Sequence, residues 1–404
     1  MMPQDVYFGI DQKQRLKESC KEWGNYALVC NQASLDAQLQ ATPDVLRNIQ
    51  GKQAKLTCIW GPQHGFFGHA QDNMIETEDD TTSPVHQVPI YSLYGKTREP
   101  TPPMLSKLNS IIVDIQLSGT RVYTYKATLL ATLKAAKRAN LKVVILDRPN
   151  PLGGKFVAGR VLEQEMISFV GPDLLPMRHG LSTGEMARFL NRKINADLEV
   201  IEIKGWNPDT TWLTQKRPWI LTSPNLPTLK SVILYPGLVA LEGCNLSEGR
   251  GTTLPFECVG SRAFVNPKQL IGRLYDLLPK LQGVQLRPFR FEPTFSKWSG
   301  HCCYGVQFIV ENPDLFCSFH LGIALIKCYM DLIGDNFAFK AAPYEYEYRR
   351  NPMDLILGSR EGSKKIEDYR PDDSFWSAGL TDYCAQVAPY LIYPRAMTPT
   401  NPQN

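Results

Sequence analysis

The first 150 residues contain four short, mainly apolar runs, and these constrain the fold more than any other feature of the chain. The runs are Tyr26–Cys30, Leu56–Trp60, Ile111–Val113 and Val143–Leu146. Continuous apolar runs of this length are typical of strands that are buried on both faces of a parallel sheet. Thr124–Ala139 lies between the last two runs and has apolar residues at helical spacing, with basic residues near its C-terminal end. The sequence therefore predicts βαβ units and an α/β fold with a mainly parallel sheet.

Polar side chains stand just beyond the end of each of these runs. They are Asn31, Gln63, His64, Asp114, Gln116, Asp147, Arg148 and Asn150. In open α/β sheets, the ligand crevice forms at the C-terminal ends of the strands. Any one of these residues has an equally simple explanation as a turn or helix-capping residue. Four such positions in succession favour a binding site.

The chain of 404 residues exceeds what one hydrophobic core usually serves, so we expect two domains. We place the first at residues 1–262 and the second, smaller α/β domain at residues 263–404. In the first, Ser182 and Glu185 fit a capping box at the start of a further helix.

The second region has fewer strong patterns. We expect helices at Lys268–Leu278 and Leu321–Leu332, and a strand at Gly305–Val310. Two stretches rich in aromatics and proline, residues 288–295 and 342–352, are interpreted as turns and packing aromatics. The polar stretch from residue 395 to the end is expected to be frayed.

The composition excludes several classes of protein. Apolar residues make up 43% of the chain, the net charge is only +4, and no Lys/Arg block stands out. No apolar run approaches the roughly 20 residues of a membrane span, so we expect neither a membrane nor a nucleic-acid partner. The start lacks the apolar core of a signal peptide, and the ten cysteines form no CxxC pair or regular framework. We therefore expect a cytoplasmic protein with reduced thiols, without a metal site or cofactor; the oligomeric state is not predicted.

The densest group of polar residues is the stretch Leu241–Glu257, which reads LEGCNLSEGRGTTLPFE. It follows the apolar run Val232–Tyr235, which we interpret as strand-like, and a Tyr-Pro-Gly turn. Its three glycines let the backbone approach a ligand closely. A solvated loop whose charges pair with each other is the simple alternative. The mixture of acids, amides, hydroxyls and one arginine favours a site for a polyhydroxylated ligand.

The usual catalytic motifs are absent: there is no GxGxxG after the first strand, no Walker loop, no GxSxG and no HExxH. Several acids remain, namely Glu76, Asp114, Asp147, Glu242, Glu248 and Glu257. Glycoside hydrolysis needs two carboxyl groups across a cleft. The residues by themselves thus indicate an enzyme that acts on a sugar or another polar ligand.

A series of motifs resembles those of the NamZ-type exo-β-N-acetylmuramidases. They are GPQHGFFG, PIYSLYG, DIQLSGTRVYTY, LDRPNPLGG, FVGPDLLPMRHGLSTGEMA, SPNLPT, YPG and EGCNLSEGRGTTLPFE, in this order between about residues 8 and 358. The resemblance implies a Rossmann-like N-terminal domain, a smaller C-terminal domain and a cleft between them. It also implies release of N-acetylmuramic acid from the non-reducing ends of peptidoglycan fragments. The strand ends, the polar loop and this resemblance together suggest residues that bind saccharides containing muramic acid: Asn31, Asp114, Gln116, Arg121, Tyr123, Asp147, Arg148, Asn150, His179, Asn225, Glu242, Asn245 and Arg250.

One departure from the family pattern affects the chemistry. The motif that usually reads PEHG reads PQHG here, so Gln63 stands where the resemblance implies a catalytic glutamate. An amide cannot exchange a proton in that role. We expect Glu76 to replace it, because its neighbours Met74 and Ile75 would bury it and raise its pKa, with Glu248 as second acid and His64 as a supporting donor. In the alternative, Glu76 belongs to a solvated acidic patch.

Two further expectations concern the substrate and its setting. An arginine would bind the lactyl carboxylate of muramic acid in a bidentate pair, and the candidates are Arg121, Arg148 and Arg250, each of which has a structural ion pair as its alternative. The expected cytoplasmic location suits cell-wall recycling. The competing hypothesis is a muropeptide-binding or sensor protein that has lost catalysis.

Overall fold

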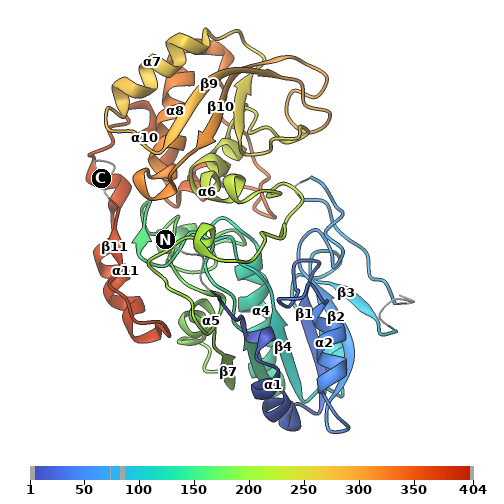
Figure 1. Cartoon of the computed structure of the whole chain (residues 1–404). Coiled ribbons are helices and arrows are strands. Elements are labelled where there is room, and N and C mark those ends of the chain that lie inside the picture. The colour runs from blue at the N-terminus through green and yellow to red at the C-terminus, as the bar shows by residue number, and fades with distance from the viewer. Residues whose placement is uncertain (1–4, 73, 82–86, 401–404) are drawn as a thin grey trace.

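The computed structural model describes residues 5–72, 74–81 and 87–400, and these form two stacked halves (Figure 1). The first half contains a six-stranded sheet in the order β3-β2-β1-β4-β5-β7. Every neighbouring pair of strands is parallel. This confirms the predicted Rossmann-like parallel sheet. The strands are β1 (Asn25–Cys30), β2 (Lys55–Gly61), β3 (Ile90–Ser92), β4 (Ser110–Asp114), β5 (Lys142–Leu146) and β7 (Leu198–Ile201).

Helices cover both faces of this sheet, which explains why its strands read as continuous apolar runs. Ile111 and Val113 of β4 share a core with Leu129 of α4 (Tyr125–Ala139), and α5 (Thr183–Asn191) joins the same core. The alternate residue Ile112 faces the other core, with Leu16 and Leu46. That core contains α1 (Lys13–Ser19) and α2 (Thr42–Ile49). The short α3 (Pro102–Leu105) precedes β4.

The predicted capping box at the start of α5 is confirmed. The Ser182 side chain accepts a hydrogen bond from the backbone N–H of Glu185, and the Glu185 carboxylate accepts one from the backbone N–H of Ser182. These two bonds satisfy donors that the first turn of a helix otherwise leaves free.

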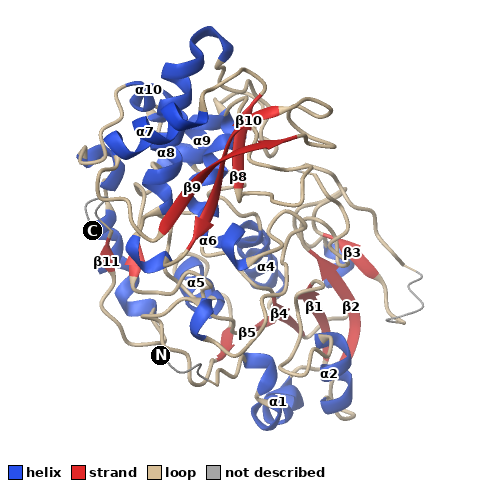
Figure 2. Cartoon of the chain, turned by 45° about the horizontal axis from the view of Figure 1, so that its top comes forward, coloured by secondary structure: helices blue, strands red, loops and turns tan. Residues whose placement is uncertain are grey.

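The second half is built on a three-stranded antiparallel sheet in the order β8-β10-β9 (Figure 2). The predicted strand is β10 (Cys303–Val310), and the two predicted helices are α7 (Pro267–Leu277) and α8 (Ser318–Ile333). The interpretation of residues 288–291 as a turn is wrong, because they lie in β9. Pro288 is tolerated there since β9 is an edge strand. The remaining elements are β8 (Cys258–Ser261), β9 (Val284–Phe291), α9 (Pro352–Leu357) and α10 (Gly362–Glu367).

The run Val232–Tyr235 is not a strand but part of helix α6 (Leu229–Leu238). Thr228 caps the helix by accepting from the backbone N–H of Ser231. Residues 231–238 are all buried, so the helix lacks the polar face that would have revealed its period. It packs closely on α8, where Gly237 meets Gly322 with no room for a side chain.

The C-terminal stretch returns to the first half along the outside of the molecule (Figure 1). After α11 (Leu380–Val387), the short β11 (Thr398–Pro399) pairs in parallel with β6 (Phe156–Val157). Arg395 forms a buried ion pair with Glu185 at 2.7 Å. The expectation that residues from 395 onward are frayed is therefore wrong for residues 395–400; residues 401–404 lie outside the described part of the chain.

The boundary between the two halves and the lengths of the helices complete the description of the fold. The domain boundary expected at residue 262 stays a prediction; α6 precedes that position and packs on α8, which follows it. Among the described residues, no helix combines the length and the apolarity needed to cross a membrane.

Candidate active site

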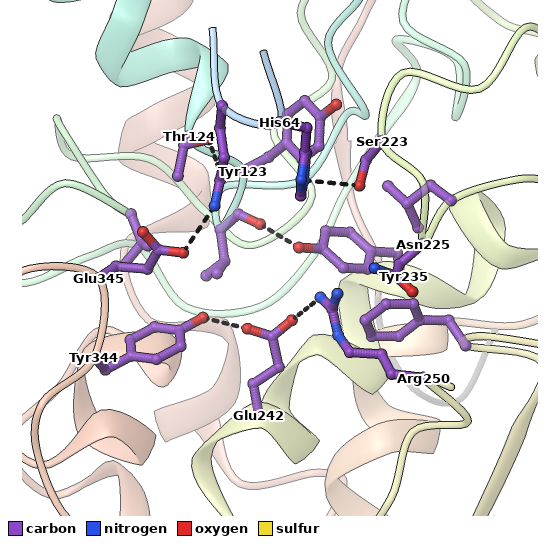
Figure 3. A pocket seen from close by; sticks show the side chains of 15 residues that line it. His64, Tyr123, Thr124, Ser223, Asn225, Tyr235, Glu242, Arg250, Tyr344 and Glu345 are labelled. Atoms are coloured by element: carbon purple, nitrogen blue, oxygen red, sulfur yellow. Dashed lines mark hydrogen bonds and ion pairs between the residues drawn. The ribbon is translucent and has the colours of Figure 1, made fainter. Parts of the chain in front are cut away.

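A pocket lies where the C-terminal edge of the parallel sheet meets the second half of the chain (Figure 3). This central pocket has about 380 Å³ of empty space, counting the part that opens to solvent. Its polar side chains come from connections after β2 and β4, from the segment before α6, and from two loops of the second half. A concave site with convergent polar groups is the best candidate for an active site. It is lined by Gln63, His64, Val122, Tyr123, Thr124, Val170, Ser223, Asn225, Leu226, Tyr235, Glu242, Arg250, Phe256, Tyr344 and Glu345.

Glu345 provides a buried carboxyl group in this pocket. Only 4% of the residue is exposed. Tyr94 donates its hydroxyl to Oε2 at 2.6 Å, and Gln63 donates Nε2 to Oε1 at 3.2 Å. Burial, the largest cause, raises the pKa of Glu345 to about 6. The charge of Glu242 also raises this pKa, whereas the two hydrogen bonds lower it.

Gln63, at the position of the missing family glutamate, has both ends of its amide engaged. The Thr124 hydroxyl donates to its Oε1, so Nε2 is the end that faces Glu345. Thr124 is the N-cap of α4, which fixes its position. The amide is thus oriented as a donor to a carboxylate.

A second carboxyl group, that of Glu242, enters the pocket from another direction (Figure 3). Arg250 donates Nη2 to Oε1 at 2.6 Å, and the Tyr344 hydroxyl donates to Oε2 at 2.6 Å. Burial would lower the pKa of Arg250, but the charges of Glu242 and Glu248 outweigh burial and raise it above its usual value. Glu242 is therefore held beside a permanently charged guanidinium.

The glycines predicted to shape this loop do so at two positions. Gly249 and Gly251 both have φ near 81°, a conformation that other residues rarely adopt. At Gly251, an added Cβ would lie 2.5 Å from the backbone oxygen of Phe295. The loop can therefore turn tightly enough to direct Arg250 at Glu242.

His64 lines the pocket, and its role as a supporting donor stays a prediction. Its Nδ1 lies 2.8 Å from the carbonyl oxygen of Ala70, which accepts, so Nδ1 carries the proton. Burial is the main reason that the pKa of His64 falls to about 4, which leaves the ring neutral. Nε2 must then accept a hydrogen bond from the Ser223 hydroxyl, 3.0 Å away.

A second pocket of about 780 Å³, open to solvent, adjoins the central one and shares Glu242, Arg250 and Tyr344 with it. Asn245 and Glu248 line only the second pocket. Glu248 forms ion pairs with Arg250 at 3.0 Å and with Lys297 at 2.6 Å. The expected second acid is thus committed to two cations and lies outside the central pocket.

Several residues predicted to bind the substrate contact other parts of the chain instead of lining the central pocket. Asp147 accepts hydrogen bonds from Ser182, Gly184 and Tyr393, although burial still raises its pKa to about 7. Tyr393 of the C-terminal stretch covers Asp147, and Gln116 and Arg148 line a separate pocket. The residues concerned are Asn31, Asp114, Gln116, Asp147, Asn150 and His179.

Two of the three candidate arginines have structural partners. Arg121 is fully buried and donates to the backbone oxygens of Arg160, Leu175 and Ile356. Arg148 forms a bidentate pair with Asp114. Among the three, only Arg250 lines the pocket.

Glu76 is not buried as expected. Its side chain is 53% exposed and pairs with Arg98 at the surface. The Met74 side chain does not cover Glu76, because its sulfur accepts a hydrogen bond from the backbone N–H of Glu345. The connection after β2 therefore does not return Glu76 to the pocket.

Sequence reasoning missed Glu345 and its partner Tyr94. The two lie 251 positions apart, and Glu345 lies 282 positions from Gln63. The stretch APYEYEYRRNP was interpreted as packing aromatics and turns. The sequence gives no signal that singles out Glu345, because Glu347 also lies between two tyrosines and is partly exposed.

Comparisons with known proteins agree over most of the chain. Residues 26–230 match the family model "Exo-beta-N-acetylmuramidase NamZ, N-terminal", and residues 233–393 match the corresponding C-terminal model. The peptidoglycan beta-N-acetylmuramidase NamZ of Bacillus subtilis (strain 168) is 40% identical over 373 residues, which cover 91% of this chain and 86% of that protein.

Two solved structures of DUF1343 family proteins from Bacteroides fragilis NCTC 9343 have the same fold. One superposes with a TM-score of 0.85 at 30% identity, and the other with a TM-score of 0.69 at 26% identity. Each match covers 96% of this chain and 99% of the other.

Proposed function

The chain belongs to the NamZ family of exo-β-N-acetylmuramidases, and we propose that it is a glycoside hydrolase that releases N-acetylmuramic acid from the non-reducing end of peptidoglycan fragments. The observation that supports this most is the pair of buried carboxyl groups, Glu345 and Glu242, in one polar pocket. Hydrolysis of a glycosidic bond needs one carboxyl that can be protonated and one that is ionised. The different partners of the two groups suit these two states.

Glu242 is the carboxylate of this pair. Its contact with Arg250 favours the ionised form, and the Tyr344 hydroxyl fixes its orientation. Positive charge develops at the anomeric carbon as the glycosidic bond breaks, and a carboxylate fixed nearby stabilises that charge.

Arg250 is our proposed reader of the lactyl carboxylate, the group that distinguishes muramic acid from glucosamine. Its Nη1 is buried and has no hydrogen-bond partner in the part of the chain that the structure describes. It lies where the central and second pockets meet. A guanidinium with a remaining donor suits a carboxylate ligand.

The second pocket provides room for the rest of the fragment. Lys297 and Lys340 line it, together with Asn245. We propose that it accepts the sugar that leaves. A role in cell-wall recycling in the cytoplasm also stays a prediction, and fractionation of the native host would test it.

Incubation with the disaccharide of N-acetylmuramic acid linked β-1,4 to N-acetylglucosamine tests the function. Mass spectrometry should detect free N-acetylmuramic acid in amounts that grow with time and enzyme concentration. The matched control is the disaccharide with glucosamine at the non-reducing end, which lacks the lactyl group. Binding of the first disaccharide without turnover would instead support the sensor hypothesis.

A further inference from the structure

We propose that Glu345 is the general acid of this enzyme and replaces, from the opposite half of the chain, the glutamate that Gln63 cannot supply. The inference rests on the proposed glycosidase function. It assigns the proton donor to a loop between α8 and α9, far in sequence from the motif in which the family resemblance places it.

The first argument is position. Nε2 of Gln63 lies 3.2 Å from Oε1 of Glu345. Glutamine and glutamate have the same shape, so a glutamate at position 63 would place its carboxyl in direct contact with Glu345. Glu345 therefore presents a carboxyl one hydrogen bond away from where the family carboxyl would lie, on the lining of the same pocket.

The second argument concerns charge. Two carboxyl groups in contact cannot both be ionised without strong repulsion. An amide at position 63 removes the repulsion and donates a hydrogen bond to Glu345. The pair Gln63 and Glu345 thus acts as one carboxyl with an orienting amide.

The third argument is the protonation state. The charged or titratable groups near Glu345 are Tyr94, Tyr235, Glu242, Arg250 and Tyr344. Burial and the charge of Glu242 raise the pKa of Glu345, and the Tyr94 hydrogen bond and Arg250 lower it, with a net value of about 6. A carboxyl with this pKa holds a proton in a useful fraction of molecules near neutral pH.

Backbone strain gives independent support. Glu345 and Tyr346 have φ of 43° and 66°, in the left-handed region that residues other than glycine rarely adopt. Strained residues of this kind cluster at functional sites. Here the strain places the Glu345 side chain against Gln63 and Tyr94.

The reaction balances without a cofactor. Glu345 gives its proton to the glycosidic oxygen, and the bond from the anomeric carbon to that oxygen breaks with its electron pair on the departing sugar. A water molecule supplies the new hydroxyl at the anomeric carbon. The proton that the water loses restores the acid form of Glu345 over the cycle.

The test compares Glu345→Gln with the unmodified protein on two substrates that differ only in the leaving group. The disaccharide needs protonation of its leaving oxygen, whereas a 2,4-dinitrophenyl β-N-acetylmuramide does not. We expect kcat on the disaccharide to fall about 10²- to 10⁴-fold, and kcat on the aryl glycoside to fall less than about 10-fold. Glu78→Gln is the matched control, because Glu78 is an exposed acid outside both pockets; it should leave both rates unchanged.

A second variant exchanges the carboxyl and the amide between positions 63 and 345. Gln63→Glu combined with Glu345→Gln restores one acid and one amide at the same pair, and we expect it to recover at least 10-fold of the lost rate on the disaccharide. An equal loss on both substrates, or a Glu345→Gln rate within about 3-fold of the unmodified rate, would overturn the assignment. If Glu345→Gln does not fold, the unmodified protein decides: kcat/KM for the disaccharide should fall with rising pH on a basic limb that the aryl glycoside lacks, and the same limb on both substrates would overturn the assignment. If the unmodified protein releases no N-acetylmuramic acid, the proposed function fails instead.

Discussion

Replacement of Glu345 by glutamine is expected to stabilise the folded protein above pH 6, even though it removes activity. Burial shifts the pKa of this carboxyl from its ordinary value of 4.5 to about 6. One pKa unit corresponds to about 1.4 kcal/mol, so ionisation of Glu345 costs the folded state about 2 kcal/mol. Glutamine occupies the same volume and can keep both hydrogen bonds, with Gln63 as donor and Tyr94 as acceptor.

The sign follows from proton binding. The folded state binds the Glu345 proton more tightly than the unfolded state, so the carboxyl imposes no penalty below pH 4.5. The penalty grows as the pH rises through 6 and is complete above it. Glu345→Gln should therefore match the unmodified protein at pH 4 and exceed its free energy of unfolding by up to about 2 kcal/mol at pH 7.5.

Urea unfolding monitored by tryptophan fluorescence at pH 4, 5, 6 and 7.5 measures this difference. Glu78→Gln again serves as the control, since its exposed carboxyl should give no pH-dependent difference. A variant that is less stable than the unmodified protein by the same amount at every pH would refute the reasoning. It would mean that Glu345 has a structural role, because its hydrogen bonds stabilise the folded protein by more than the burial of its charge destabilises it.

Three further predictions concern other parts of the molecule. Tyr94→Phe removes a 2.6 Å hydrogen bond that favours ionised Glu345, so the basic limb of kcat/KM against pH should move up from about 6 by about 1 to 2 units; a limb that stays in place contradicts this. Arg250→Lys, in folded protein, should reduce the preference for muramyl over glucosaminyl disaccharides at least about 10-fold, because lysine lacks the planar donor pair; an unchanged preference would remove Arg250 from recognition. Arg395→Ala leaves buried Glu185 without its ion pair and should lower the free energy of unfolding by about 3 kcal/mol. The control is Arg360→Ala, which removes an exposed ion pair with Glu165 and should lower the free energy of unfolding by less than about 1 kcal/mol in the same urea titration.

The parallel sheet was predictable because burial on both faces makes each strand a continuous apolar run. Ile111, Ile112 and Val113 are apolar in succession since they face two different cores. The same reasoning failed for α6, where burial on all sides produced an apolar run without a helical period. Periodicity reveals a helix only when one of its faces meets water.

Only those parts of the candidate site whose residues lie close together in the sequence were predictable. Gln63, Tyr123 and Asn225 were found because they lie in compact motifs, and Glu242 and Arg250 because they share one polar loop. Asp147 was misplaced because its partner Tyr393 lies 246 positions away in the returning C-terminal stretch. The prediction of Glu76 assumed a contact between near neighbours in sequence, whereas Glu345 reaches Gln63 across the interface of the two halves.

Groups from both halves of the molecule set the orientation and the pKa of Glu345. Gln63 and Tyr94, which orient Glu345, belong to the first half, while Glu242, which raises its pKa, belongs to the second. The second half contains both Glu345 and Glu242, but it lacks the two hydrogen-bond donors, Gln63 and Tyr94, which come from the first half. A small movement that separates the halves would admit water, weaken both hydrogen bonds and return the pKa of Glu345 towards 4.5. The properties of the proposed acid therefore depend on the contact between the two halves, which holds Gln63 and Tyr94 against Glu345.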